Sequence, residues 1–233
     1  MLHKETVSEG TLDLINRLMA DEQLKDFYLV GGTALSLMIG HRISIDIDLF
    51  TDRDFDASLM AEYLKSQYET EVRNVNKNSV SGFIEGIKFD LISHRYPHVK
   101  PIEIREGIRM LSLYDIAAMK VNAIVGNGTR VKDFIDIYYL LKELSYGQII
   151  ESYVKKYPDV NPAIARTSLL YHKDIDFTIN ITLLKGPVSW PAIDKGIRNA
   201  ISAHHKNLGQ ERFMQKIRQA KKDNGNDLNG PKL

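Results

Sequence analysis

Apolar residues in the first half of the chain switch several times between helical and strand spacing. Leu12, Ile15 and Leu18 recur on one face of a helix, which predicts a first amphipathic helix over about residues 8–24. A short apolar run at 27–30 predicts a buried strand. The same pattern predicts further elements in a fixed order: a helix ending near residue 39, a strand over 45–50, a helix after Asp56, strands near 70–76, 80–85 and 87–93, and helices over about 113–125 and 131–144.

The pattern changes near residue 110, from mixed α/β to largely helical. We therefore expect an α/β domain over 1–110 and a helical domain over 111–222, followed by a disordered tail over 223–233 that is polar and rich in Gly and Asn. Within the helical part, four prolines are expected to separate short helices: Pro158, Pro162, Pro187 and Pro191. The predicted fold class is α/β (α+β), with a helical C-terminal half.

Composition narrows the class of protein without indicating a chemistry. The 233 residues are 43% hydrophobic and 26% charged, as in ordinary globular proteins. Their 31 Lys and Arg against 30 Asp and Glu leave no strong field that would attract nucleic acid or a membrane surface. The absence of cysteine excludes disulfides, thiolate metal sites and cysteine nucleophiles. No apolar run reaches the ~18 residues of a membrane-spanning helix, and the first residues lack a signal-peptide core, so we expect a cytoplasmic protein with no membrane partner.

An apolar run that ends in two glycines indicates a phosphate site. The run reads VGGTALSL, in which Gly31 and Gly32 permit a tight turn without a Cβ clash. Thr33 is expected to cap the helix that follows. Backbone amides at such a turn can hold a phosphate group.

Two carboxylates follow in the next predicted strand. Asp46 and Asp48 fall on one face of that strand, because successive side chains point to opposite faces. Their like charges, about 6–7 Å apart, repel each other, and a divalent cation between them removes that cost. A solvated acidic edge strand is the alternative, but such a strand has no need of the glycine turn upstream. The two motifs together supply what a protein needs to hold a nucleoside triphosphate with its metal.

A third carboxylate belongs to the strand predicted over 87–93, where Phe89 and Leu91 alternate with Asp90. If this strand lies beside the one that carries Asp46 and Asp48, the three aspartates meet on one surface. Three carboxylates suit two Mg²⁺ ions, which prefer oxygen ligands. Asp90 would then hold one metal and take the proton of an attacking hydroxyl as general base. The alternative for Asp90 is a surface residue of an amphipathic strand.

These motifs resemble the nucleotidyltransferase superfamily typified by DNA polymerase β. The resemblance lies in Gly32-Thr33, a spacer, Asp46-Ile47-Asp48 and a strand-borne Asp90. Within that superfamily, VGGTALSL and HRISIDIDLF are similar to the AbiEii/AbiGii toxins of bacterial abortive-infection and toxin–antitoxin systems. The resemblance continues through MLSLYDIAAMKVNAIVGNGTRVKDFIDIYYLL and covers roughly residues 27–143. It implies a polymerase β-like mixed sheet with flanking helices, followed by a helical C-terminal half.

The resemblance also implies a set of site residues. The family follows its catalytic sheet with a helix that bears a lysine, matched by Lys120, and with a basic-Asp-x-x-Asp helix, matched by Lys132, Asp133 and Asp136. The residues expected to bind the nucleotide are thus Gly31, Gly32, Thr33, Lys120, Lys132, Asp133 and Asp136, and those expected to bind metal and carry catalysis are Asp46, Asp48 and Asp90. Plainer interpretations remain: Lys120 can snorkel beside an apolar stripe, Lys132 can pair with Asp136 across one helical turn, and Asp133 and Asp136 can make structural hydrogen bonds.

The activity that the resemblance implies is transfer of a nucleoside monophosphate from an NTP to an acceptor, with Mg²⁺ or Mn²⁺. Some relatives are toxins that add nucleotides to tRNA ends, and the family is usually countered by an antitoxin. The acceptor can be RNA such as tRNA, a protein or a small molecule, and the resemblance implies an antitoxin protein as partner. Two alternatives stay open: a DxD-dependent glycosyltransferase that uses a sugar nucleotide, and a non-catalytic nucleotide- or partner-binding module with the same fold. The basic stretch between Arg198 and Lys222 is either an RNA contact or a solvated helix face.

Overall fold

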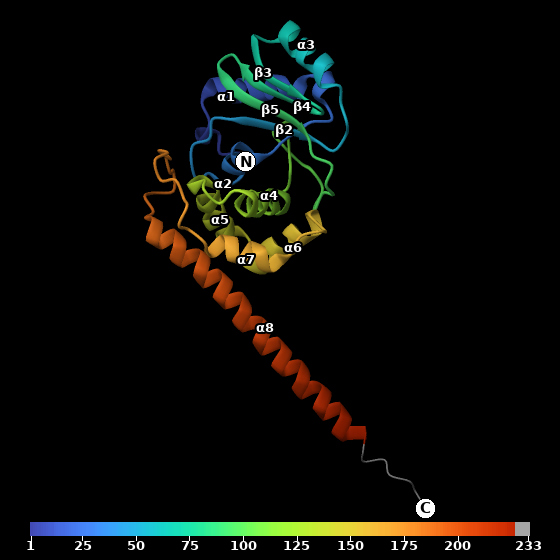
Figure 1. The fold of residues 1–233 in the computed structure, drawn as a ribbon, viewed down its shortest axis with the longest axis vertical. Helices are drawn as coiled ribbons and strands as arrows, with labels where there is room; N and C mark the ends of the chain where they lie inside the picture. Colours follow the sequence, from blue (N-terminus) through green and yellow to red (C-terminus); the bar gives the residue numbers. More distant parts are fainter. Residues whose placement is uncertain (227–233) are drawn as a thin grey trace, which may run out of the picture.

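The computed structural model describes residues 1–226, and residues 227–233 lie outside the described part (Figure 1). Two short 3-10 helices, η1 (Lys4–Thr6) and η2 (Glu22–Leu24), flank the first α-helix. The main elements, in chain order, are α1 (Glu9–Ala20), β1 (Tyr28–Leu29), α2 (Gly31–Ile39), β2 (Ile47–Thr51), α3 (Ala57–Gln67), β3 (Thr70–Asn76), β4 (Ser79–Ile84), β5 (Ile87–Ser93), β6 (Glu103–Arg105), β7 (Ile108–Met110), α4 (Leu113–Gly126), α5 (Val131–Glu143), α6 (Tyr146–Lys156), α7 (Pro162–Leu170) and α8 (Trp190–Asn226). The predicted α/β class is confirmed.

Seven strands form one mixed sheet, in the order β3-β4-β5-β2-β1-β7-β6. The pairs β2–β5 and β1–β7 are parallel, and the other neighbours are antiparallel. In the β2–β5 pair, Asp48 lies opposite Asp90, and Ile47 lies opposite Phe89. Ile47 and Phe89 are fully buried. Because side chains alternate along a strand, burying these two on one face leaves both aspartates on the other.

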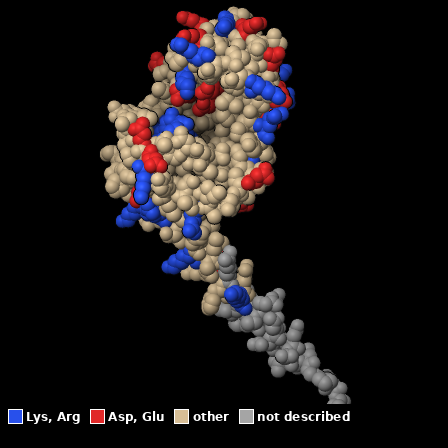
Figure 2. All heavy atoms as spheres, in the orientation of Figure 1, with Lys and Arg blue, Asp and Glu red and all other residues tan. Residues whose placement is uncertain are grey.

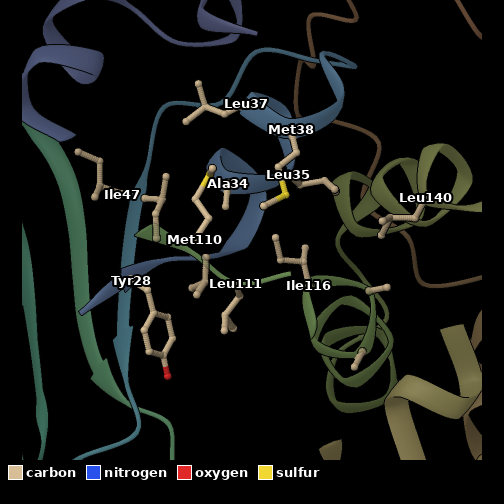
Figure 3. Close-up of a cluster of buried hydrophobic side chains, with 14 of the residues drawn as sticks. Tyr28, Ala34, Leu35, Leu37, Met38, Ile47, Met110, Leu111, Ile116 and Leu140 are labelled. Atoms are coloured by element: carbon tan, nitrogen blue, oxygen red, sulfur yellow. The ribbon is translucent and has the colours of Figure 1, made fainter. Parts of the chain in front are cut away.

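A single apolar core joins the sheet to the helices. In Figure 1 the sheet forms one end of the molecule, α4 to α7 lie beneath it, and α8 runs away from the body. Figure 3 shows Leu35 of α2, Ile116 of α4 and Leu140 of α5 among the side chains that fill the space between the sheet and the helices, and all three are fully buried. Each such side chain stabilises the fold by about 1.5–3 kcal/mol. The division into two domains near residue 110 stays a prediction.

Two predicted helix starts are confirmed by their caps. Asp56 precedes α3 and accepts hydrogen bonds from the backbone amides of Ser58 and Leu59. Ser112 precedes α4 and accepts from the amide of Asp115. Such caps satisfy amides that have no partner inside the helix. Within residues 1–226, no helix has both the length and the apolar composition needed to cross a membrane.

Three expectations differ from the structure. Helix α2 begins at Gly31, so Thr33 is its third residue rather than its cap. Helix α8 runs for 37 residues from Trp190, and the prolines therefore do not divide this part into short helices alone. Pro191 lies in the first turn of α8, where a backbone amide would have no helical partner in any case. Residues 223–226 of the expected tail are the end of α8, and the rest of that tail lies outside the described residues.

Candidate active site

The three aspartates meet at one cavity. Asp46 directly precedes β2, Asp48 lies on it, and Asp90 lies opposite Asp48 on β5. All three line a cavity of about 570 Å³ between the sheet and α4–α5, and Figure 2 shows acidic and basic side chains close together along a hollow in this face. The expectation that the aspartates share one surface is confirmed. Their roles stay predictions.

The carboxylates are crowded and only partly neutralised. Burial raises the pKa of Asp48, and the charge of Asp90 beside it raises that pKa further. Lys88 lies beside Asp90 on the same face of β5, with its Nζ 3.4 Å from Asp90 Oδ2. On the other side of the cavity, Lys132 Nζ lies 3.8 Å from Asp46 Oδ2. A group with positive charge between Asp48 and Asp90 would therefore be stabilised.

The two glycines of α2 allow charged side chains to approach the start of the helix. Gly31 has a φ of +70°, and a Cβ there would overlap the Asp48 carboxylate. A Cβ at Gly32 would overlap the Arg42 guanidinium. Val30, the residue before this first turn, provides no side-chain cap, and both glycines line the cavity. An uncapped helix start offers free amides and the positive end of the helix dipole to an anion.

Thr33 does not line the cavity. Its side chain is buried, and its hydroxyl donates to the main-chain carbonyl oxygen of Asp46 and lies 3.0 Å from the Ser44 hydroxyl. In this structure Thr33 therefore holds the backbone just before β2 in place, rather than presenting its hydroxyl to a phosphate as expected.

A buried ionic network ties the loop before β2 to the helical half. Asp136 is fully buried and accepts hydrogen bonds from His41 Nε2 at 2.8 Å, and from Arg42 Nε at 2.7 Å and Nη2 at 3.0 Å. Lys120 Nζ lies 2.7 Å from Asp136 and 2.8 Å from Asp133. Burial alone would raise the pKa of Asp136, but the charges of Lys120 and Arg42 hold it well below its ordinary value. The network therefore keeps two cations and two anions paired inside the protein.

Several sequence interpretations are corrected by this network. Lys120 does not snorkel to solvent, because its side chain is 9% exposed and paired with two aspartates. Lys132 faces Asp46 and not Asp136. Asp133 lines the cavity, whereas Asp136 lies behind it and positions Arg42 and Lys120. The nucleotide-binding roles of these residues stay predictions.

Two cavity residues were missed or undervalued from sequence. Arg42 lines the cavity, yet its partner Asp136 is 94 positions away, so no local pattern marks it. Lys88 also lines the cavity. Its position two residues before Asp90, on the same strand face, was the signal that would have found it. The basic stretch between Arg198 and Lys222 lies along α8, which runs away from the cavity in Figure 1.

The carboxylate oxygens that line the cavity fit Mg²⁺, although they do not form a complete metal site on their own. Among the side chains that the structure describes, no three of His, Asp or Glu converge closely enough to form a ready metal cluster. The carboxylates at hand are nevertheless oxygen donors, and two of them face each other in register on β2 and β5. Mg²⁺ accepts such partial sets because it keeps waters and substrate phosphate oxygens among its ligands.

Comparisons with known proteins agree with this geometry. An uncharacterised protein from Aquifex aeolicus (strain VF5) is 34% identical over 155 residues, which is 64% of this chain and 75% of the relative. Among solved structures, JHP933 from Helicobacter pylori superposes with a TM-score of 0.53 at 16% identity, over 91% of this chain and 99% of that one. A candidate nucleotidyltransferase from H. pylori superposes with a TM-score of 0.53 at 18% identity, over 87% and 98%. These two structures share the fold.

The family assignment follows from the sequence match. Residues 13–169 match the model of the family described as "Nucleotidyl transferase AbiEii toxin, Type IV TA system". That stretch contains β1, the start of α2, the three aspartates and the network around Asp136. It identifies the chain as a nucleotidyltransferase rather than a glycosyltransferase. The chain belongs to the AbiEii family of nucleotidyltransferase toxins.

Proposed function

We propose that this protein transfers a nucleoside monophosphate from an NTP to an RNA acceptor in a reaction that requires Mg²⁺ or Mn²⁺. The observation that carries the proposal is the charge distribution of one cavity. Asp48 and Asp90 bring negative charges together at one place in the cavity, and Arg130 and Lys132 bring positive charges together at another. A triphosphate with its bound cation supplies the opposite charge to both places.

The cations and the start of α2 would hold the triphosphate. Burial lowers the pKa of Lys132, and the nearby charge of Arg130 lowers it further, so an anion beside these two residues would be stabilised. The uncapped amides at Gly31 and Gly32 add donors without adding charge. Arg42 is fixed by Asp136 with its Nη2 close to Gly32, which leaves little freedom to lose when a phosphate binds.

The three aspartates would hold the metal and prepare the acceptor. Asp46, Asp48 and Asp90 provide the carboxylate oxygens for Mg²⁺. When bound, Mg²⁺ would draw charge from the phosphates and assist the departure of pyrophosphate. Asp90, whose side chain is 25% exposed at the cavity, takes the proton of the acceptor hydroxyl as that oxygen attacks the α-phosphorus. Lys88, whose Nζ lies 3.4 Å from Asp90 Oδ2, would hold that carboxylate in position at the cavity.

The family description supports the biological role that we propose. A toxin of a type IV toxin–antitoxin system implies an antitoxin that counters it. RNA, including tRNA, is the acceptor we propose, and a cytoplasmic location belongs to the same proposal. Expression of the active protein alone should then arrest growth, and the arrest should require the same aspartates as the chemistry.

The test is transfer of label from NTP to RNA. The protein is incubated with each NTP labelled at the α-phosphate, with Mg²⁺ and total cellular RNA, and the RNA is separated by size. We expect label on a discrete RNA class, no label when EDTA removes the metal, and full recovery when Mg²⁺ is returned. Asp48→Asn should abolish transfer, while Asp54→Asn, an exposed aspartate outside the cavity, should not. Label that appears on RNA equally with Asp48→Asn would contradict the proposal.

The non-catalytic alternative gives a different outcome in the same design. Saturable NTP binding without a product on RNA, protein or small molecules would indicate a non-catalytic module.

A further inference from the structure

The segment between α7 and α8, residues 171–189, forms neither helix nor strand, and we call it the strap. It lies beyond residues 13–169, which match the family model. In Figure 1 the strap, coloured orange, leaves the end of α7, climbs along the side of the body and returns to the start of α8. Phe177 of the strap packs edge-on against Trp190, the first residue of α8, with ring centroids 5.1 Å apart.

One end of the strap is fixed to the loop that precedes α5. The amide of Asp176 donates to the carbonyl oxygen of Thr129 at 2.8 Å, and Asp176 forms a parallel bridge with Arg130, a cavity residue. The Asp176 carboxylate also accepts from the amide and the hydroxyl of Thr178, at 2.8 and 2.6 Å. These bonds fix the backbone directly before Ile179.

The other end of the strap is fixed to the loop that precedes β2. The amide of Ile43 donates to the carbonyl oxygen of Thr182, and the amide of Leu184 donates to that of His41, both at 2.9 Å. An antiparallel bridge pairs the strap with Arg42. The strap thus spans two loops that carry site cations, and Ile179 lies between its two attachments.

Ile179 lines the active-site cavity. The residue is 49% exposed, so about half of its surface is open to solvent at the cavity. From the helical half, Met119 and Ala123 of α4 also line the cavity, and they lie on one helix face because they are four residues apart. The helical half thus adds three apolar residues to a cavity that is otherwise largely charged.

The cavity has room for more than a triphosphate. Its volume of about 570 Å³ lies within the range of sites that enclose a whole small ligand. A nucleobase is flat and presents weakly polar faces, so it is favoured against methyl and thioether groups rather than against carboxylates. In an NTP complex, the charged side chains of the cavity would contact the phosphates and the metal. The apolar side chains would then contact the base.

We propose that the strap completes the nucleotide site, with Ile179, Met119 and Ala123 forming the surface that contacts the nucleobase of the NTP. This inference rests on the proposed function, because it assumes that an NTP occupies the cavity. The strap reaches the cavity only because it is bonded to the loops before β2 and α5. A chain that ended at the family match would lack this contact.

Binding of NTPs and of inorganic tripolyphosphate, which has no base, separates the two parts of the site. Dissociation constants are measured by calorimetry with Mg²⁺ for the wild type, for Ile179→Ala and for a control on the same strap, Leu184→Ala, whose residue is outside the cavity lining. Ile179→Ala should weaken each NTP about tenfold and leave tripolyphosphate unchanged. Leu184→Ala should change neither. Because Ile179 is half exposed, its substitution should also leave the thermal unfolding midpoint unchanged.

Three outcomes would overturn the inference. Unchanged NTP affinity in Ile179→Ala would show that the base does not contact the strap. Equal losses for NTP and tripolyphosphate would show that the strap acts through the phosphate-binding cations instead. A wild type that binds no NTP would contradict this inference and the proposed function together. By contrast, a wild type that transfers label to RNA while Ile179→Ala keeps full NTP affinity contradicts the inference alone.

Discussion

Substitution of Asp136 by Asn tests whether the buried network holds the active-site loop to the helical half. Asp136 lies at the centre of this network, where its carboxylate is shared by His41, Arg42 and Lys120. Burial lowers the pKa of His41, so its ring adds little positive charge at neutral pH and the balance is two cations against two anions. The Asn side chain has nearly the same shape but carries no charge. It therefore leaves one buried cation uncompensated and removes the carboxylate that joins Arg42 to α5.

The expected loss is large because the whole network is buried. Breaking a buried ionic pair by removing one partner typically costs about 3–5 kcal/mol. Asp133→Asn should cost less, about 1–3 kcal/mol, because one oxygen of Asp133 already lacks a hydrogen bond. Asp54→Asn removes an exposed pair with Arg95 and should leave the free energy of unfolding unchanged.

Equilibrium unfolding in urea measures these differences. The expected order of the free energies of unfolding is wild type equal to Asp54→Asn, then Asp133→Asn, then Asp136→Asn. The linear dependence on urea should keep the same slope in all four proteins, since the surface exposed on unfolding does not change. An Asp136→Asn protein as stable as the Asp54→Asn control would refute the reasoning, because it would show that the loop before β2 is held by other contacts.

Three further predictions concern the glycine turn, the second buried pair and the metal. Gly31→Ala and Gly86→Ala both place Ala at a positive φ (+70° and +77°), which should cost each about 1–2 kcal/mol of stability, and Gly31→Ala should lose more because its Cβ must also displace the Asp48 carboxylate. Only Gly31→Ala should lose nucleotidyl transfer, because its Cβ would overlap Asp48 whereas the one at Gly86 meets nothing. Lys156→Met should lower the free energy of unfolding by about 3 kcal/mol, because Lys156 is buried and pairs with Asp115 at 2.9 Å; equal stability would contradict the account. Dialysis against EDTA should abolish transfer without changing the circular dichroism spectrum, and unchanged transfer would contradict a metal-dependent reaction.

The aspartate cluster could be predicted from the sequence, because it depends on the alternation of side chains along two strands. Alternation in IDIDLF and IKFDLI assigns Asp48 and Asp90 to the polar faces of two strands. Apolar runs of that kind pair within one sheet, and the parallel register then brings the two aspartates opposite each other. The caps of α3 and α4 were predictable for a similar reason, since Asp56 and Ser112 act on amides two or three residues away.

The ionic network and the strap could not be predicted from the sequence, because their contacts join distant parts of the chain. Arg42 and Asp136 are 94 positions apart, and nothing near either residue specifies the other. Thr33 was expected to bind a phosphate. The local motif does not show that the fold brings the main-chain carbonyl oxygen of Asp46 next to the Thr33 hydroxyl. The strap has no helical or strand period, so its place over the cavity is set only by backbone hydrogen bonds to two loops.

Two further elements were missed for local reasons. Strands β6 and β7 have three residues each, which is too short for a clear alternation, and they are joined by a tight turn at Gly107. The length of α8 was underestimated because Pro191 was taken as a break. A proline in the first turn of a helix is compatible with that helix.

The most direct test of the central claim is the single-turnover rate of nucleotidyl transfer in Asp90→Asn, measured with saturating NTP and Mg²⁺ beside wild type and Asp54→Asn. Asp90 is the aspartate that only the pairing of β5 with β2 brings to the site. The account predicts a fall of about a hundredfold to ten-thousandfold in Asp90→Asn, with an unchanged rate in Asp54→Asn. A rate in Asp90→Asn equal to that of the wild type would contradict it.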